Sequence, residues 1–120
     1  MRTYLLIAFG GAAGSVLRFF LSSIMAQKMG QAFLGTMFVN VTGSFLIGLI
    51  AALGPIKLWE QLLMIGLLGG YTTFSSFSLQ TLDLMHQGRW PAAFSNAIGS
   101  MLFCLIAVWL GHLTGNAFRR

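Results

Sequence analysis

The feature that most constrains this chain is the length of its uncharged stretches. No charged residue occurs in residues 29–56, 61–82 or 90–118. A membrane-spanning helix needs about 20 consecutive, mostly apolar residues, so each of these three stretches is long enough to cross a bilayer. A fourth stretch, residues 3–17, reaches that length only if its helix continues past Arg18.

Composition favours a membrane protein and argues against a nucleic-acid partner. Only 8% of the residues are charged, whereas 57% are hydrophobic. A soluble domain carries roughly 25% charged residues, so this chain could not cover its surface with polar groups in water. The net charge of +5 comes from Lys and Arg residues scattered between apolar runs, and basic residues at membrane ends are expected from topology.

We therefore predict an all-α membrane protein with a single four-helix transmembrane domain over residues 1–120. The connections are short, so neighbouring helices should run antiparallel. The first helix imitates a signal peptide, with Arg2 ahead of an apolar run. Apolar character resumes after Arg18, however, which favours a membrane helix. The four helices are expected near residues 3–25, 33–53, 60–84 and 92–115.

Basic residues give this chain almost no preferred orientation in the membrane. Four crossings place both termini and the 54–59 loop on one side, with four Lys and Arg residues, against three on the other side if Arg18 is counted there. Either the chain has one weakly specified topology, or it inserts both ways and pairs head to tail. A four-helix chain can hardly enclose a polar pathway alone, which favours an oligomer.

The segment of residues 69–78, GGYTTFSSFS, interrupts the apolar pattern inside the third helix. Broken helix within a membrane is tolerated only where it is buried in protein or lines a polar cavity. We therefore expect a break at Gly69–Thr72, whose freed carbonyl oxygens are hard ligands suited to a small cation. Phe74 and Phe77 share a helix face, and their electropositive ring edges can support an anion.

Each of these polar features has a simpler alternative interpretation. Ser and Thr hydroxyls often bond the carbonyl four residues earlier, and the Phe rings can simply pack. Arg18 either faces inward and supplies positive potential for an anion, or extends to the membrane interface. Asn40 in the second helix either lines a pathway or makes an interhelical hydrogen bond. The spacings Gly10-x-x-x-Gly14 and Gly66-x-x-x-Gly70 indicate close helix packing and nothing more.

Missing residue types exclude several functions. The carboxylates Glu60 and Asp83 stand at the two ends of the third helix, which disfavours a small multidrug-type exporter because such exporters need a buried membrane carboxylate. No nucleophile–base pair, His/Cys cluster or nucleotide-binding loop is present, so we do not expect an enzyme. A non-conducting membrane scaffold remains an alternative, although it would leave the Phe and Ser/Thr residues without a purpose.

Four motifs together resemble the Fluc (CrcB) family of bacterial fluoride-specific ion channels, over nearly the whole chain. The longest is residues 69–78, and the others are GGAAGSVLR at 10–18, GTMFVNVTG at 35–43 and NAIGS at 96–100. The resemblance implies passive export of toxic fluoride from the cytoplasm by a multi-pass protein of the bacterial inner membrane. It also implies an antiparallel homodimer, formed by dual-topology insertion, with two pores.

The same resemblance implies roles for individual residues. A structural Na⁺, which is not transported, would lie at the dimer centre on the backbone carbonyls of Gly69 and Thr72 from both subunits. The residues that match the family's fluoride pathway are Phe74, Phe77, Asn40, Arg18 and a hydroxyl track of Ser75, Ser76, Ser78 and Ser100.

Three positions depart from the pattern common in that family. Ser76 stands where many members carry Thr, which is a mild change. Gln80 stands where many carry Glu, so this position offers an amide in place of a carboxylate at that end of the pore. Asn96 stands where some members have a serine, and its amide can still donate a hydrogen bond.

Overall fold

The computed structural model describes residues 1–54 and 57–119, and every regular element in these residues is a helix. The predicted all-α fold is therefore confirmed. Each helix runs somewhat differently from its expected range, and the third is divided in two. The elements are α1 (Arg2–Met29), α2 (Ala32–Ala52), α3 (Leu58–Tyr71), α4 (Phe74–His86) and α5 (Trp90–Phe118).

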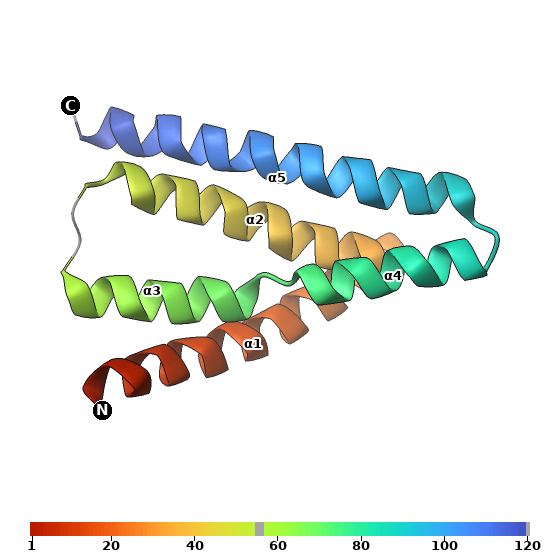
Figure 1. The fold of residues 1–120 in the computed structure, drawn as a ribbon. Coiled ribbons are helices and arrows are strands. Elements are labelled where there is room, and N and C mark those ends of the chain that lie inside the picture. Colours follow the sequence, from red (N-terminus) through yellow and green to blue (C-terminus); the bar gives the residue numbers. More distant parts are fainter. Residues whose placement is uncertain (55–56, 120) are drawn as a thin grey trace.

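Three of these helices are long and apolar enough to cross a membrane, namely α1, α2 and α5. Neither α3, with 14 residues, nor α4, with 13, reaches that length alone. The two short helices follow one another along one line of the bundle (Figure 1). Both chain termini lie at the same end of the bundle as the start of α3 (Figure 1), which is the arrangement expected for four antiparallel passes.

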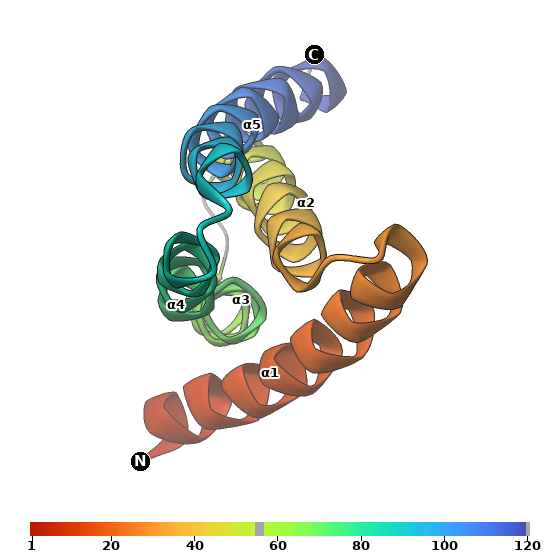
Figure 2. The same ribbon diagram turned by 90° about the vertical axis from the view of Figure 1, so that its right-hand side faces the viewer.

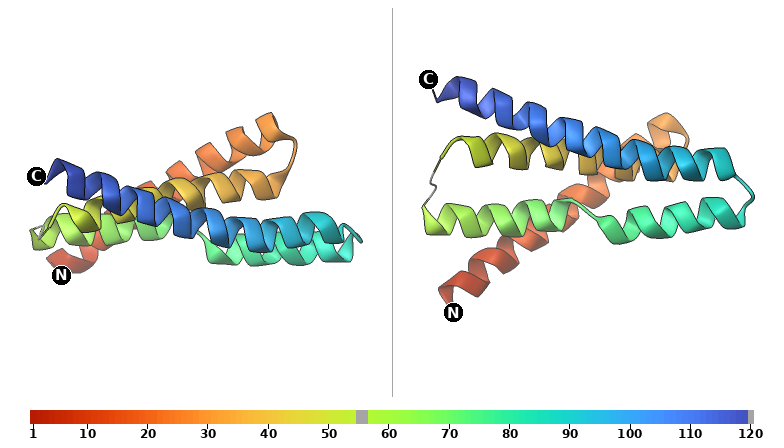
Figure 3. Two further views of the ribbon diagram at one scale, coloured as in Figure 1. Left: turned by 90° about the horizontal axis from the view of Figure 1, so that it is seen from above. Right: turned by 45° about the horizontal axis from the view of Figure 1, so that its top comes forward.

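Helix α1 crosses the other helices obliquely, whereas α2, α5 and the α3–α4 line run nearly side by side (Figures 2 and 3). The first helix ends at Met29, four residues later than expected, and the next residue, Gly30, has a left-handed φ of 71°. Glycine adopts that conformation without steric cost and commonly ends helices. A second left-handed glycine, Gly88 with φ 70°, turns the chain between α4 and α5.

The division of the third helix lies at Thr72–Thr73, so the expected position, Gly69–Thr72, is corrected by this structure. Gly69 and Gly70 remain helical. The extended residues are the threonines, with φ −85° and ψ 155° at Thr72 and φ −151° and ψ 120° at Thr73. Their branched β-carbons favour extended backbone, whereas the glycine at position 70 serves helix contact.

Glycines bring α3 directly against α1, as the two Gly-x-x-x-Gly spacings indicated. A β-carbon at Gly70 would collide with the backbone of Gly11, and one at Gly66 would lie 3.1 Å from the Gly11 nitrogen. A β-carbon at Gly14 would lie 2.9 Å from the Tyr71 nitrogen. Close backbone approach of this kind is the usual way in which membrane helices pack.

Helices α2 and α5 also approach each other closely at glycines, which the sequence did not lead us to expect. A β-carbon at Gly48 would collide with the carbonyl of Val108, and one at Gly111 would collide with that of Phe45. Large apolar side chains such as Phe103 and Trp109 on α5 point outward, 53% and 61% exposed. The outer faces of the bundle are thus apolar, as a lipid environment requires.

Candidate functional site

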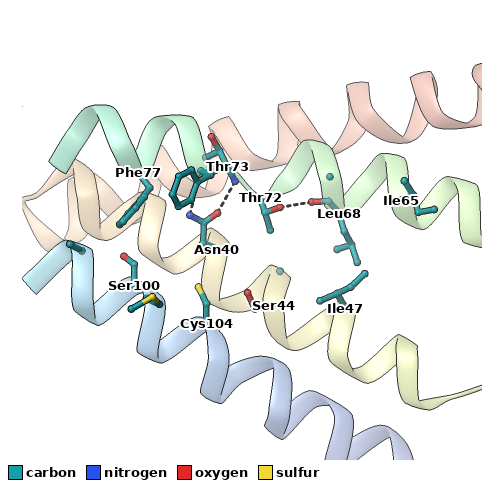
Figure 4. Close-up of a pocket in the computed structure, with 15 residues that line it drawn as sticks. Asn40, Ser44, Ile47, Ile65, Leu68, Thr72, Thr73, Phe77, Ser100 and Cys104 are labelled. Atoms are coloured by element: carbon teal, nitrogen blue, oxygen red, sulfur yellow. Dashed lines mark hydrogen bonds between the residues drawn. The ribbon is translucent and has the colours of Figure 1, made fainter. Parts of the chain in front are cut away.

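A groove of about 680 Å³ lies beside the break at Thr72–Thr73, between helices of the bundle (Figure 4). Helices α2 and α5 form one side of it, while α3, α4 and the break form the other. The polar groups in its mainly apolar wall come from three separate parts of the chain. The residues that line it are Asn40, Gly43, Ser44, Ile47, Ile65, Leu68, Gly69, Thr72, Thr73, Phe74, Phe77, Ala97, Ser100, Met101 and Cys104.

The side chain of Asn40 holds the break in place. The backbone N–H of Thr73 donates to Oδ1 of Asn40 over 2.8 Å, and Nδ2 of Asn40 donates to the Thr73 carbonyl over 2.9 Å (Figure 4). One amide thus replaces both backbone bonds that Thr73 loses by leaving the helix. A primary amide has a second N–H, so Asn40 keeps one donor for another partner in the groove.

The same arrangement frees backbone carbonyls on the α3 side of the break. The last bond of α3 runs from the Thr72 N–H to the Leu68 carbonyl, at 3.0 Å. The Thr73 N–H, which would otherwise reach Gly69, is turned toward Asn40. Among the hydrogen bonds of residues 1–54 and 57–119, none reaches the carbonyl oxygen of Gly69 or of Thr72.

Tyr71 anchors the end of α3 on α2, a contact that sequence reasoning missed. The phenol of Tyr71, only 4% exposed, lies 2.7 Å from the Thr42 hydroxyl. That hydroxyl also donates to the Phe38 carbonyl, so its lone pairs accept from Tyr71. The only available signal was a tyrosine inside an aliphatic run, since its partner on α2 depends on how the helices pack.

The hydroxyls beyond the break mostly serve local backbone bonds. Thr73 caps α4 by accepting from the Ser76 N–H over 3.2 Å, and its hydroxyl also bonds those of Ser75 and Ser76. Ser78 donates to the Phe74 carbonyl over 2.9 Å, which is the simpler use of serine in a helix. These three serines lie outside the groove lining within the described chain, and of the expected hydroxyl track only Ser100 belongs to it.

The two phenylalanines of α4 pack against each other in the wall of the groove. Their ring centroids lie 5.1 Å apart with the planes tilted by 42°. Phe77 is half-buried against the groove, whereas Phe74 is 78% exposed. The structure therefore places Phe77, Asn40 and Ser100 around one space (Figure 4). Phe74 lines the same groove, although most of its ring is exposed in the single chain.

A second polar cluster joins α4 to α5. Ser100 donates to Oδ1 of Asn96 over 3.1 Å, and Nδ2 of Asn96 donates to the Thr81 hydroxyl over 2.9 Å. Asn96 is only 1% exposed and does not line the groove. Its amide N–H is thus directed to Thr81, a partner that the sequence analysis did not name.

Arg18 lies outside the groove, half-buried on α1. It stands one turn after Gly14, which contacts α3, and one turn before Ser22, whose carbonyl contacts Gly35 of α2. Residues four apart share one face of a helix. Arg18 therefore starts from the face of α1 that packs on the bundle, which favours an inward position over a lipid-facing one.

Comparison with known proteins finds one family and several close relatives of this chain. Residues 5–112 match the family described as CrcB-like protein, Camphor Resistance (CrcB). A relative from Opitutus terrae, named fluoride-specific ion channel FluC, is 51% identical over 94% of this chain and 92% of its own. Relatives of the same name are 50% identical in Rhodospirillum rubrum, over 92% of both chains, and 44% identical in Paramagnetospirillum magneticum, over the full length of both. The family match over residues 5–112 and the near full-length relatives at 44–51% identity show that the chain belongs to the CrcB-like family.

Proposed function

We propose that this chain is a fluoride-specific ion channel through which fluoride leaves the bacterial cytoplasm passively across the inner membrane. The observation that carries the proposal is the groove, in which Phe77, Asn40 and Ser100 meet although they come from three different helices. The name carried by the full-length relatives supports fluoride as the anion.

The groove chemistry suits a small, strongly hydrated anion. The free N–H of Asn40 can replace one lost water, and the electropositive edge of the Phe77 ring can replace another. No Lys or Arg side chain is among the residues that line the groove. An anion can therefore be stabilised there without being trapped by a full opposite charge.

The proposal includes an antiparallel homodimer with two pathways. The ring of Phe74 in the groove wall supports it. This large apolar side chain is 78% exposed in the single chain, and a second subunit would cover it. The balanced distribution of Lys and Arg over the two ends supports insertion in both orientations. One wall of each pathway would then come from the partner subunit.

The proposal also includes one structural Na⁺ at the dimer centre. The Gly69 and Thr72 carbonyls fit this ion, since they are hard oxygen ligands without a hydrogen-bond donor in the described chain. Unpaired carbonyls in a dry interior are costly, and a cation would satisfy them. Two oxygens from each subunit would hold the ion in place as a staple, outside the fluoride pathways.

A multidrug-type exporter is less well supported. The carboxylates Glu60 and Asp83 lie in the first turn of α3 and near the end of α4, and neither lines the groove. A non-conducting scaffold would account for the glycine contacts between helices. It would give no purpose to the polar groups that meet in the groove.

The direct test is fluoride efflux from liposomes that contain the purified protein. Vesicles loaded with potassium fluoride are diluted into fluoride-free buffer. Valinomycin lets K⁺ leave together with fluoride, so that no opposing membrane potential builds up, and a fluoride electrode follows the external concentration. We expect rapid release that protein-free vesicles do not show. Release at the rate of protein-free vesicles would contradict the proposed function.

A further inference from the structure

Three hydrogen bonds in series run from the groove into the contact between α4 and α5. Ser100 lines the groove and bonds Asn96, Asn96 bonds Thr81, and Thr81 bonds the Phe77 carbonyl over 2.8 Å. Asn96 is 1% exposed and Thr81 is 8% exposed, and neither lines the groove. Of the side-chain hydroxyl and amide groups in the series, only the Ser100 hydroxyl can therefore meet an anion directly.

The direction of every bond in the series follows from its last acceptor. A carbonyl can only accept, so Thr81 gives its single hydroxyl proton to Phe77. Thr81 then offers only lone pairs to Asn96, which must present its amide nitrogen. The amide oxygen of Asn96 consequently faces Ser100, and the Ser100 hydroxyl must be the donor.

This direction determines what Ser100 offers to the groove. Its proton points at Asn96, so its lone pairs are what remains for an anion, and lone pairs repel an anion. The hydroxyl can turn its proton into the groove only by leaving Oδ1 of Asn96 without a donor. Because Asn96 is almost completely buried, that oxygen has no access to water in exchange, and an unsatisfied buried acceptor is unfavourable.

Resting on the proposed function, we propose that Asn96 is a positioning residue that controls the Ser100 proton. A fluoride ion in the groove competes with the Asn96 oxygen for that proton, and the competition keeps the ion weakly held at this point. Removing the Asn96 oxygen frees the proton for the anion. Asn96 thus tunes the occupancy of the pathway without touching the ion.

The test is a double-mutant cycle between Asn96 and Ser100. Asn96→Leu keeps the branched shape of the side chain and removes the acceptor, and efflux is measured at fluoride concentrations too low to fill the pathway. Since a typical hydrogen bond corresponds to about a fivefold change in an equilibrium, we expect efflux to rise about fivefold. In a Ser100→Ala background the same substitution should leave efflux unchanged, because no proton is left to release.

A second variant covers the case in which Asn96→Leu does not assemble. Thr81→Val removes the hydroxyl that fixes the Asn96 amide, so the amide can turn and release Ser100. We expect fluoride efflux to rise in this variant too, and the rise should again be absent in the Ser100→Ala background. The matched control is Thr114→Val, since Thr114 makes the same bond to a carbonyl four residues earlier, at 2.8 Å to Leu110, with no further partner in the described chain.

The outcomes separate this inference from the proposed function. If the unsubstituted protein does not release fluoride, the proposed function fails and this inference fails with it. If the unsubstituted protein conducts but Asn96→Leu and Thr81→Val leave efflux unchanged, or change it equally with and without the Ser100 hydroxyl, only the inference is overturned. A change in Thr114→Val as large as that in Thr81→Val would also overturn it.

Discussion

At the residue scale, Asn40 combines a structural and a chemical task in one amide. Two of its polar groups hold the backbone of Thr73 at the break, and one N–H remains for the groove. No residue without both a donor and an acceptor can satisfy the N–H and the carbonyl of Thr73 together. Stability and conduction should therefore both depend on this side chain.

Replacing Asn40 by Ala should destabilise the protein as well as impair efflux. It leaves the Thr73 N–H and carbonyl without their partners, at a cost of about 1–3 kcal/mol for each group. We expect a clearly lower midpoint of thermal unfolding in detergent. Ser44→Ala is the matched control, since Ser44 lies one turn further along α2 and also lines the groove, and it should unfold close to the unsubstituted protein. Equal midpoints for the two variants would contradict the role of Asn40 at the break.

The Phe77 ring should matter through its polarised edge. Phe77→Ile keeps apolar bulk in the groove and removes that edge, so we expect most fluoride efflux to be lost while the protein still assembles. Phe103→Ile is the control, because Phe103 is 53% exposed on α5 and does not line the groove. Normal efflux through Phe77→Ile would show that the ring only packs.

At the scale of elements, the divided third helix shows which features can be predicted from sequence and which cannot. Uncharged stretches predicted the helices, and a cluster of Gly, Thr and Ser predicted a break. The break lies at Thr72–Thr73 because Gly70 is needed against the backbone of Gly11, a contact that depends on how α1 crosses α3. The partnership of Thr81 with Asn96 escaped prediction for the same reason, since helix register is a property of the packed bundle.

The contact between α1 and α3 should tolerate a methyl group at one glycine and reject it at another. A β-carbon at Gly14 would collide with the Leu67 carbonyl, whereas one at Gly11 meets its nearest atom at 3.8 Å. Gly14→Ala should therefore lower stability by about 1–3 kcal/mol through overpacking. Gly11→Ala should be neutral or slightly stabilising, because Ala favours helix over Gly. Thermal unfolding of both variants checks this, and the opposite order would contradict the packing described here.

At the scale of the whole molecule, two features of the single chain support the proposed dimer. Its groove is bordered by the exposed ring of Phe74, and the carbonyls of Gly69 and Thr72 have no donors within the described residues. A second, inverted copy of the chain with a central cation would complete both features. The molecule that conducts is therefore expected to be the dimer.

Removal of Na⁺ should weaken this assembly. If the protein is purified and assayed with N-methylglucamine in place of Na⁺ and K⁺, no small cation is available to the carbonyls at the break. We expect the midpoint of thermal unfolding to fall and to return to its original value when Na⁺ is added. A cation that stabilises the native state without binding the unfolded chain raises the midpoint in this concentration-dependent way. A midpoint that is independent of Na⁺ would contradict a structural ion at Gly69 and Thr72.

Selective conduction of fluoride through the groove can be measured as the reversal potential of single channels. The protein is placed in a planar bilayer with fluoride on one side and an equal concentration of chloride on the other. We expect a reversal potential displaced far toward the equilibrium potential of fluoride, because the described groove lining offers few donors and no cationic side chain to a larger anion. Equal permeation of the two anions would give a reversal potential near zero. That result would contradict selective conduction of fluoride.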